Sequence, residues 1–327
     1  MRSRFVNNFL YRIKWHSRQI LAVTLLPHIY KNLKKLRSFS KENRGNIAIV
    51  ILCEHIGDII TCEPVSSYLK QEKGKKVVWI VRSSYKEVLS LFENVDLVLD
   101  VGCISECAIM TRFIKSYEVH NLHMDPRGCS KYGISLHNAN KTYVFDNYFK
   151  YGSILETFSV VGNLPRLKKK PHLSLLPEDR FPELSIPFVA IQLDSNEGIK
   201  SWDTEKWQKL ISSFPNIQFV EIGLVSHLSQ SPNCNSTYCG HLSLVDIAYL
   251  INKCSAFIGI DSSVAHYANA LDKPSVIMLG QYANYMSYVP YSVWDDSFYI
   301  IHAKGVVKDL SLEQIQEIIK ERIIPLI

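Results

Sequence analysis

The chain has 327 residues, 47% of them hydrophobic and 21% charged, which is enough for two globular domains and excludes a disordered or fibrous protein. The net charge of +6 comes from one end, because residues 1–45 hold eleven Lys or Arg and a single acid, Glu42. The other 282 residues hold 26 basic and 30 acidic side chains, a net charge of −4, so no nucleic-acid partner is predicted.

Residues 1–45 form a basic arm with helical periodicity, because apolar and basic side chains fall on different sides of a helix. The apolar run at residues 20–26 is stopped by Pro27 and is too short to span a membrane. No small-x-small cleavage site follows this run, so a cleaved secretory signal peptide is not expected. Three interpretations remain open: an interfacial anchor on an anionic cytoplasmic leaflet, a basic helix packed on the body, and an organellar transit peptide. The apolar positions are Phe5, Val6, Phe9, Leu10, Ile13 and Ile20, with Tyr11 and Trp15 as exceptions to the division.

Eight cysteines are scattered along the chain, several of them within apolar strands or helices. They include no Cys-x-x-Cys pair, and no His lies near the closest pairs at the spacing of a zinc finger. We interpret them as reduced, mostly structural thiols of a cytosolic protein, with a metal site as the alternative. They are Cys53, Cys62, Cys103, Cys107, Cys129, Cys234, Cys239 and Cys254.

From Asn46 onward, apolar runs of strand length alternate with helical patterns. This alternation predicts a doubly wound α/β domain with a parallel sheet and with ligands at the carboxyl ends of the strands. Residues 46–170 are therefore predicted to form an N-terminal Rossmann-like domain. Its expected strands are residues 47–53, 76–81, 96–101 and 117–124, and its expected helices are residues 59–71, 85–92, 104–115 and 144–161.

Residues 162–187 interrupt this pattern with five prolines and a basic cluster, so an interdomain linker is placed at residues 171–187. Residues 188–327 then repeat the alternation and are predicted to form a C-terminal Rossmann-like domain with a terminal helix. Two such domains would bind a substrate in the cleft between them. The expected strands are residues 188–193, 218–224, 256–260 and 275–279, and the expected helices are residues 203–214, 244–253, 264–271 and 311–322.

One turn of this second half is suited to binding an anion. Asp261, Ser262 and Ser263 follow a buried strand and precede a helix, and all three residue types cap helix N-termini. Such a turn presents unpaired N–H groups and the helix dipole to a ligand. The alternative is that these residues only cap the helix and that His266 only packs beneath it.

Two further polar segments follow expected strands. Together with the turn at residues 261–263, they resemble the motifs of a known enzyme family. Gly57-Asp58-Ile-Ile-Thr-Cys-Glu-Pro64 is similar to the Gly-Asp-x5-Pro opening of glycosyltransferase family 9, the bacterial heptosyltransferases. Lys200-x-Trp202 resembles that family's Lys-x-Trp-Pro element. Residues 239–266 resemble its Gly-x-x-Ser/Thr-Leu lead-in to the motif Asp-Ser/Thr-Gly-x-x-His. Each element alone is weak, but their order and spacing match over residues 46–290.

The resemblance implies a GT-B fold, in which two Rossmann-like domains face a central cleft. The N-terminal domain binds the acceptor and the C-terminal domain binds a nucleotide-activated sugar. It further implies transfer with inversion, typically of heptose from ADP-heptose onto a lipopolysaccharide core or a related glycan or glycolipid. The nucleotide sugar is a co-substrate, and no other cofactor is expected. The expected location is the cytoplasmic face of the plasma membrane, which residues 1–45 would contact as a peripheral anchor.

The site residues follow from this chemistry. An inverting transfer needs a general base beside the acceptor hydroxyl, and Asp58, next to the turn residue Gly57, is the candidate. Lys200 would offset charge on the departing diphosphate. The candidate donor-binding residues are Asp261, Ser262, Ser263 and His266.

Alternatives stay open for each of these assignments. Gly57-Asp58 also fits a simple turn with a helix cap, and His266 also fits a structural role. The chain contains no Asp-x-Asp pair, so metal-assisted diphosphate binding is not suggested.

The sequence departs from the family pattern near the expected donor site. Ser263 stands where the family has Gly, and Asp203 replaces the Pro after Trp202. Residues 194–198 and 281–285 also differ from the corresponding family turns. Two alternatives therefore remain: the same fold with another nucleotide sugar as donor, and a non-catalytic relative that binds a glycan or a partner protein.

Overall fold

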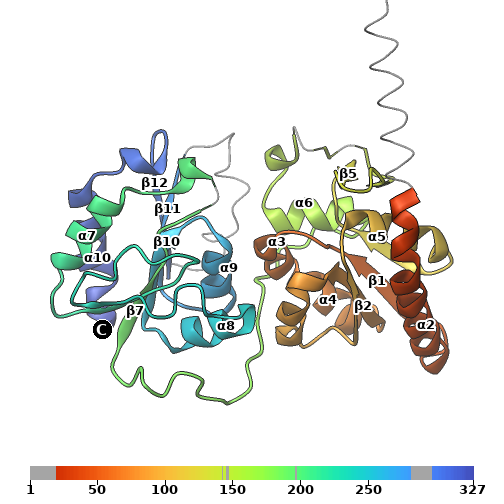
Figure 1. Ribbon diagram of the computed structural model, residues 1–327, viewed down its shortest axis with the longest axis horizontal. Helices are drawn as coiled ribbons and strands as arrows, with labels where there is room; N and C mark the ends of the chain where they lie inside the picture. The colour runs from red at the N-terminus through yellow and green to blue at the C-terminus, as the bar shows by residue number, and fades with distance from the viewer. Residues whose placement is uncertain (1–19, 142, 145–146, 196, 281–296) are drawn as a thin grey trace, which may run out of the picture. The chain divides into compact units, whose positions relative to one another are not determined.

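The computed structural model describes residues 20–141, 143–144, 147–195, 197–280 and 297–327. The chain divides into two compact units, each built around a parallel sheet (Figure 1). The first unit comprises the chain up to Glu54 and residues 64–148 and 155–168; the second comprises residues 55–63, 149–154 and 169–327. No helix in these described ranges is long and apolar enough to cross a membrane.

The sheet of the first unit has the strand order β3-β2-β1-β4, and all its strands are parallel. Strand β1 is buried along its whole length, as its run of Ile, Ala and Val predicts. The chain order reverses between β1 and β4, which is where doubly wound sheets bind ligands. The strands are β1 (Ile47–Ile51), β2 (Lys76–Arg82), β3 (Leu97–Val101) and β4 (Glu118–Asn121).

Helix α2 (Leu26–Glu42) packs on this sheet, so the second half of the basic arm is part of the folded unit. Its buried side chains Ile29, Leu33 and Leu36 join the core of strands β1 to β3. The amide of Asn32 donates a hydrogen bond of 2.7 Å to the carbonyl oxygen of Asp100. The apolar positions expected between Phe5 and Ile13 lie outside the described residues.

The other helices in the amino-terminal half of the chain are short. Helix α5 (Ile104–Met110) lies beside α2 on the same face of the sheet (Figure 1). The predicted helix at residues 59–71 is divided into α3 (Ile56–Thr61), α4 (Glu63–Ser67) and a π-helical turn (Tyr68–Glu72). The 3-10 helix Ser83–Leu91 replaces the α-helix expected at residues 85–92. A small antiparallel pair, β5 (Arg127–Gly128) and β6 (Ser135–Leu136), follows β4.

The prediction of one long helix at residues 144–161 was wrong. Among the described residues of this range, the structure has only α6 (Ile154–Val161) and the 3-10 helix Tyr148–Lys150. Between them, Gly152 has a φ of 121°, a backbone conformation that an α-helix cannot contain. The helix therefore begins after this glycine.

The second unit contains a six-stranded parallel sheet in the order β12-β11-β10-β7-β8-β9, the arrangement of a complete Rossmann sheet. Its strand order reverses between β7 and β10. Strand β12 and the two-residue β9 were not predicted from the sequence. The strands are β7 (Phe188–Ile191), β8 (Gln218–Glu221), β9 (Cys234–Asn235), β10 (Ala256–Ile260), β11 (Ser275–Leu279) and β12 (Phe298–His302).

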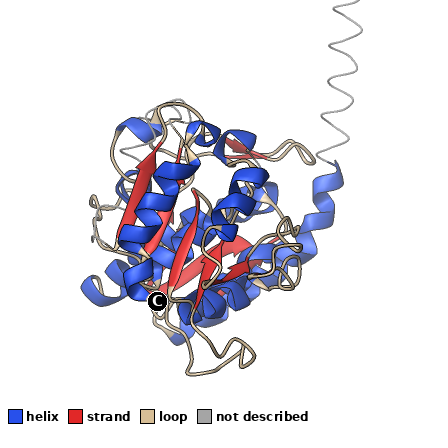
Figure 2. Cartoon of the chain, turned by 90° about the vertical axis from the view of Figure 1, so that its left-hand side faces the viewer, coloured by secondary structure: helices blue, strands red, loops and turns tan. Residues whose placement is uncertain are grey.

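Helices cover both faces of this sheet. Helices α7 (Thr204–Ser212) and α10 (Leu312–Arg322) lie on one face, and α8 (Leu244–Lys253) and α9 (Ser263–Ala270) lie on the other (Figures 1 and 2). The face of α7 and α10 holds a large buried cluster that includes Trp202 and Trp207. Helix α3 packs against α9 within this unit. A sequence boundary of 46–170 assigns α3 to the first half, whereas its packing groups it with the second unit.

Candidate functional site

The carboxyl ends of β7 and β10 meet at the point where the strand order of the second unit reverses. Gln192 follows β7, and Asp261 and Ser262 follow β10. The hydroxyl of Ser262 donates a hydrogen bond to the side-chain oxygen of Gln192 and accepts one of 3.5 Å from the backbone N–H of Ala265. The predicted cap of α9 is therefore present, and it is joined to the neighbouring strand.

Ser263 is the first residue of α9. It is not among the residues with a positive φ, so its backbone does not need the conformational freedom of glycine. The substitution of Ser for the family's Gly adds a side chain at the turn without straining it. The first N–H groups of α9 keep the orientation that favours an anion.

Lys200 and Asp261, predicted from separate motifs, lie together. The Nζ atom of Lys200 is 3.1 Å from a carboxylate oxygen of Asp261 and 3.7 Å from one of Glu197. Lys200 ends the 3-10 helix Gly198–Lys200, which follows β7. Asp261 is buried, so this ion pair is screened less by water than a surface pair would be. The structure thus places a cation beside the start of α9.

His266 lies one turn into α9 and is only 6% exposed. Burial lowers the pKa of its imidazole to about 4, and the charge of Lys200 acts in the same direction while Asp261 opposes it. The ring is therefore neutral at neutral pH. Its Nδ1 atom is 2.7 Å from the hydroxyl oxygen of Thr61, which is completely buried at the end of α3.

Gly57 is needed because α3 approaches α9 closely. A Cβ atom added at this position would lie 2.5 Å from Cδ2 and 2.8 Å from Nε2 of His266, far inside van der Waals contact. The ring of His266 therefore packs directly on the backbone of Gly57. The sequence placed Gly57 and Asp58 in a turn before the helix, which was wrong because α3 already begins at Ile56. Nothing in the local sequence indicated the partner His266, which is about two hundred residues away.

Asp58 lies in the first turn of α3, where the helix dipole favours a negative charge. Its side chain is partly exposed. Its backbone carbonyl accepts a 3.0 Å hydrogen bond from Cys62. Burial, and then the charge of Asp58, raise the pKa of the Cys62 thiol, so the carboxylate lies near that thiol.

A further carboxylate, not predicted, organises the loop after β8. Glu221 is buried, and its two oxygens accept hydrogen bonds from the backbone N–H groups of His227 at 2.9 Å and Leu228 at 3.2 Å. The ring of His227 pairs in turn with Asp194, which follows β7. The only sequence signal was an acid at the end of an apolar strand.

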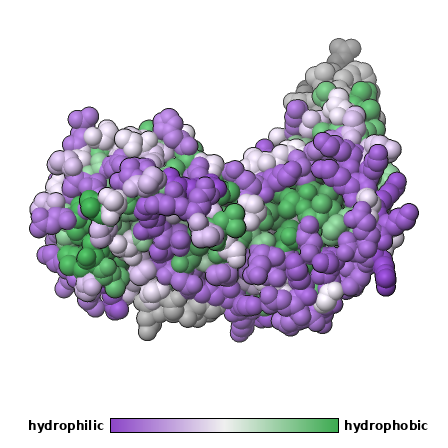
Figure 3. Space-filling model, turned by 90° about the horizontal axis from the view of Figure 1, so that it is seen from below, coloured by the Kyte–Doolittle hydropathy of each residue, from purple (hydrophilic) through white to green (hydrophobic). Residues whose placement is uncertain are grey.

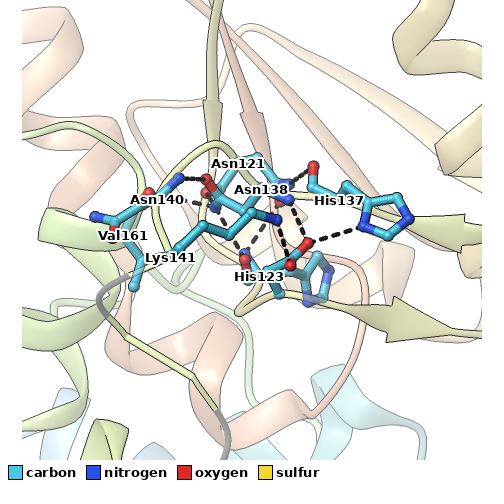
Figure 4. A network of polar contacts seen from close by, with 8 residues as sticks. Asn121, His123, His137, Asn138, Asn140, Lys141 and Val161 are labelled. Carbon is cyan, nitrogen blue, oxygen red and sulfur yellow. Dashed lines mark hydrogen bonds and ion pairs between the residues drawn. The ribbon is translucent and has the colours of Figure 1, made fainter.

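The first unit has its own polar network at the corresponding sheet edge, also missed by sequence reasoning (Figure 4). The side-chain amide of Asn138 donates to the carbonyl oxygens of Asn121 at 2.6 Å and His123 at 2.9 Å. Asp125 accepts a 3.0 Å hydrogen bond from the backbone of Asn138 and pairs with Lys141. These bonds join the segment after β4 to the loop before α6.

His123 connects that network to β1. Its Nε2 atom accepts a 2.8 Å hydrogen bond from the backbone N–H of Cys53. Glu54, which follows Cys53 in the chain, forms an ion pair in which its Oε2 atom is 2.6 Å from Nε of Arg127. The reversal point of the first sheet is thus lined by polar side chains as well.

The described residues include no group of three or more His, Cys, Asp or Glu side chains that could hold a metal ion. All eight cysteines are free thiols. The prediction of a metal-independent site stays a prediction.

One comparison with known proteins identifies a family. A family model described as glycosyltransferase family 9 (heptosyltransferase) matches residues 90–293. No curated protein sequence matches the chain. Among solved structures, a glycosyl transferase family 9 protein from Veillonella parvula DSM 2008 is 15% identical, covers 84% of this chain and 96% of its own, and has a TM-score of 0.65.

Two Escherichia coli structures are also similar. ADP-heptose lps heptosyltransferase II is 16% identical, with 84% of this chain and 98% of its own covered and a TM-score of 0.64. Heptosyltransferase WaaC with ADP is 15% identical, with 84% and 99% covered and a TM-score of 0.59. The prediction of a GT-B fold with two Rossmann-like α/β domains is confirmed by this likeness.

The packing of His266 on Gly57 can be tested by adding one methyl group. Gly57→Ala should destabilise the protein by about 1–3 kcal/mol through overpacking, measured as a lower Tm. The control is Gly198→Ala, where an added Cβ has nothing within 4 Å and the effect should stay within about 0.5 kcal/mol. Both variants gain helix propensity, so the difference between them isolates the contact. Equal Tm values would contradict the packing.

Proposed function

The chain belongs to glycosyltransferase family 9, and from this premise we propose that it transfers heptose from ADP-heptose, with inversion, to a lipopolysaccharide core or a related surface glycan. One observation carries the proposal. The first turn of α3, which carries Gly57 and Asp58, packs on α9 through His266, and the Lys200–Asp261 ion pair lies at the start of α9. The groups that we propose for proton removal and for diphosphate binding are therefore both close to α9, which supports the proposal.

Asp58 is proposed as the general base. As the acceptor hydroxyl attacks the anomeric carbon of the donor, its proton must pass to a nearby group. Asp58 is a partly exposed carboxylate in the first turn of α3, and it can accept that proton. The bond from the anomeric carbon to the diphosphate oxygen breaks on the opposite face of the sugar, which inverts the configuration.

Lys200 is proposed to stabilise the leaving diphosphate. Its ammonium group has three N–H donors, and the ion pair with Asp261 holds it beside the N-terminus of α9. There the N–H groups of Ser263 and Val264 add to the positive potential. Asp261 would then orient Lys200 and bind hydroxyls of the sugar.

His266 is the donor-binding candidate that the geometry favours least. It is buried, and its Nδ1 atom is bonded to Thr61, so contact with the donor sugar would need its other nitrogen, which faces Gly57. A supporting role between α9 and α3 fits better.

The identity of the donor can be tested with a panel of nucleotide sugars. If the proposal holds, ADP-heptose should raise the Tm of the protein more than GDP- or UDP-sugars at equal concentration, because only a bound ligand stabilises the native state. A larger shift with another sugar would support the alternative donor. The absence of any shift would favour a non-catalytic relative that binds a glycan or a partner.

Asp58→Asn should remove the base while keeping the shape of the side chain. Turnover should fall by about 10²–10⁴-fold, and the Tm shift produced by the donor should remain. The control is Glu72→Gln, an exposed acid of the same half of the chain, which should keep normal turnover. Normal turnover of the Asp58→Asn variant would contradict the assignment of Asp58 as the general base.

Lys200→Ala should weaken stabilisation of the departing diphosphate. The expected loss is about 2–4 kcal/mol, roughly 30- to 1,000-fold in kcat/KM. Lys209→Ala, which removes an exposed lysine from α7, provides the matched control. An unchanged kcat/KM for Lys200→Ala would mean that the diphosphate is neutralised elsewhere.

We also propose that the start of the described chain contacts the cytoplasmic leaflet of the plasma membrane. Ile20 is 72% and Val23 is 59% exposed, and the exposed lysines Lys31, Lys34 and Lys35 follow on α2. Hydrophobic surface is visible where the described chain begins (Figure 3, green). An apolar end with basic residues beside it suits an anionic bilayer, at about 1 kcal/mol for each basic residue near the surface.

Deleting residues 1–45 would also remove the core residues of α2, so substitutions give the cleaner test. The double variant Ile20→Asp, Val23→Asp should sediment less with vesicles that contain anionic lipid than the unchanged protein does. Leu224→Asp is the control, because Leu224 is 87% exposed and lies in the second unit. Equal sedimentation of all three proteins would refute the membrane contact.

A further inference from the structure

A groove in the first unit lies apart from the candidate site. It forms where the 3-10 turn Ala22–Leu25 and the start of α2 meet the end of α5 and strand β6, and it is open to solvent. Its volume of about 480 Å³ falls within the usual range of ligand pockets, roughly 300–1,000 Å³. Ile109 and Ile134 also pack against the core of the unit, so part of its wall is held in place. The apolar lining residues are Ala22, Val23, Leu26, Ile109 and Ile134.

The exposed apolar side chains of the first unit gather at this groove. Five of the large ones lie at the start of the described chain, and Val23 and Leu26 among them line the groove. The sixth, Phe113, is 56% exposed and follows Arg112, which is another lining residue. A cluster of this kind marks an interaction surface, whereas exposed apolar residues scattered singly do not. Among the described residues of the unit, the six are Ile20, Leu21, Val23, Leu26, Tyr30 and Phe113.

The fixed charge in the groove is positive. Arg112 lines it, and the described lining residues include no acid. The side chain of Arg112 is exposed, and its guanidinium forms no hydrogen bond or ion pair with any residue that the structure describes. A guanidinium presents a fork of N–H donors that matches two oxygens of a phosphate. The groove therefore combines an apolar wall with a group that can bind an anion.

We propose that this groove holds one phospholipid molecule of an anionic bilayer. The phosphate binds to Arg112, and an acyl chain lies along the apolar lining, where it is removed from water. This role of the groove rests on the proposed membrane contact, because the exposed residues Ile20 and Val23 bring its rim to the bilayer surface. It makes that contact specific for a lipid with both a phosphate and a chain.

Two other occupants suit the charge less well. Residues 1–19 directly precede the groove in the sequence, but they hold five Lys or Arg and no acid, so they would bring positive charge towards Arg112. A second copy of this chain would present the same basic surface. Like charges brought together in this way oppose binding, whereas an anionic lipid brings the opposite charge.

The ligand can be tested in solution with dihexanoylphosphatidylglycerol, a phospholipid with short chains, below the concentration at which it forms micelles. Calorimetric titration of the full chain should show one bound molecule for each protein. Glycerol phosphate, which lacks the chains, and octyl glucoside, which lacks the phosphate, should each bind at least about tenfold more weakly. Equal binding of glycerol phosphate would indicate a phosphate site, and equal binding of octyl glucoside would indicate a general apolar surface. Either result would overturn the proposal.

The location can be tested with two matched pairs of variants. Arg112→Gln should weaken lipid binding about tenfold, because the contact with the phosphate is lost. Arg37→Gln removes the same charge from an exposed position of α2 that does not line the groove, and it should keep the affinity within about twofold. Leu26→Ser should weaken binding about three- to tenfold. Tyr30→Ser, one turn further along α2 and outside the lining, should not.

All four positions are exposed, so the variants should fold, and an unchanged Tm without lipid checks this. Equal affinity within each pair would show that the lipid binds elsewhere. If dihexanoylphosphatidylglycerol bound only after Phe5→Ser and Phe9→Ser, residues 1–19 would occupy the groove. If it dissociated a dimer of the protein, the occupant would be a second copy. Both outcomes would contradict the proposal.

Failure of the proposed membrane contact would look different. In that case the Ile20→Asp, Val23→Asp variant would sediment with anionic vesicles as the unchanged protein does. The titration with the short-chain lipid involves no bilayer, so it would still report whether Arg112 and Leu26 bind a phospholipid.

Discussion

The close contact between the backbone of Gly57 and the ring of His266 is the constraint on which the candidate site depends. A side chain at residue 57 would push α3 away from α9, and with it Asp58. The contact is possible because the buried imidazole is neutral, so no charge has to be solvated beneath the helix. The charged groups lie at the carboxyl end of β10 instead, where Lys200 and Asp261 satisfy each other.

The parts of the fold that were predicted correctly are those in which local pattern and tertiary environment agree. Strands β1, β7, β10 and β11 are continuous apolar runs that are fully buried, and such runs have few other possible structures. The helix expected at residues 144–161 failed because one glycine with a left-handed backbone outweighs a favourable composition. Strand β9 has two residues and depends on pairing with β8, so it carries no periodic signal of its own.

The candidate site was predicted only as far as its motifs extend. Gly57, Asp58, Lys200 and Asp261 stood out because each follows a strand in a recognisable order. The residues that hold them in place did not, because their partners are distant in sequence: Thr61 and His266 are 205 positions apart, and Ser262 and Gln192 are 70 apart. A threonine in a helix or a glutamine after a strand has many structural roles, and only packing selects one.

The grouping of residues 55–63 with the second unit means that the chain cannot be separated into its two units by one cut. A fragment beginning at the proline-rich segment of residues 171–187 would contain α9 without α3, and the imidazole of His266 would lose both Thr61 and the backbone of Gly57. A chimera that exchanges the amino-terminal half for that of a relative would replace this contact as well. Recombination between family members is therefore constrained to keep α3 and α9 from the same parent, even though about two hundred residues separate them in the sequence.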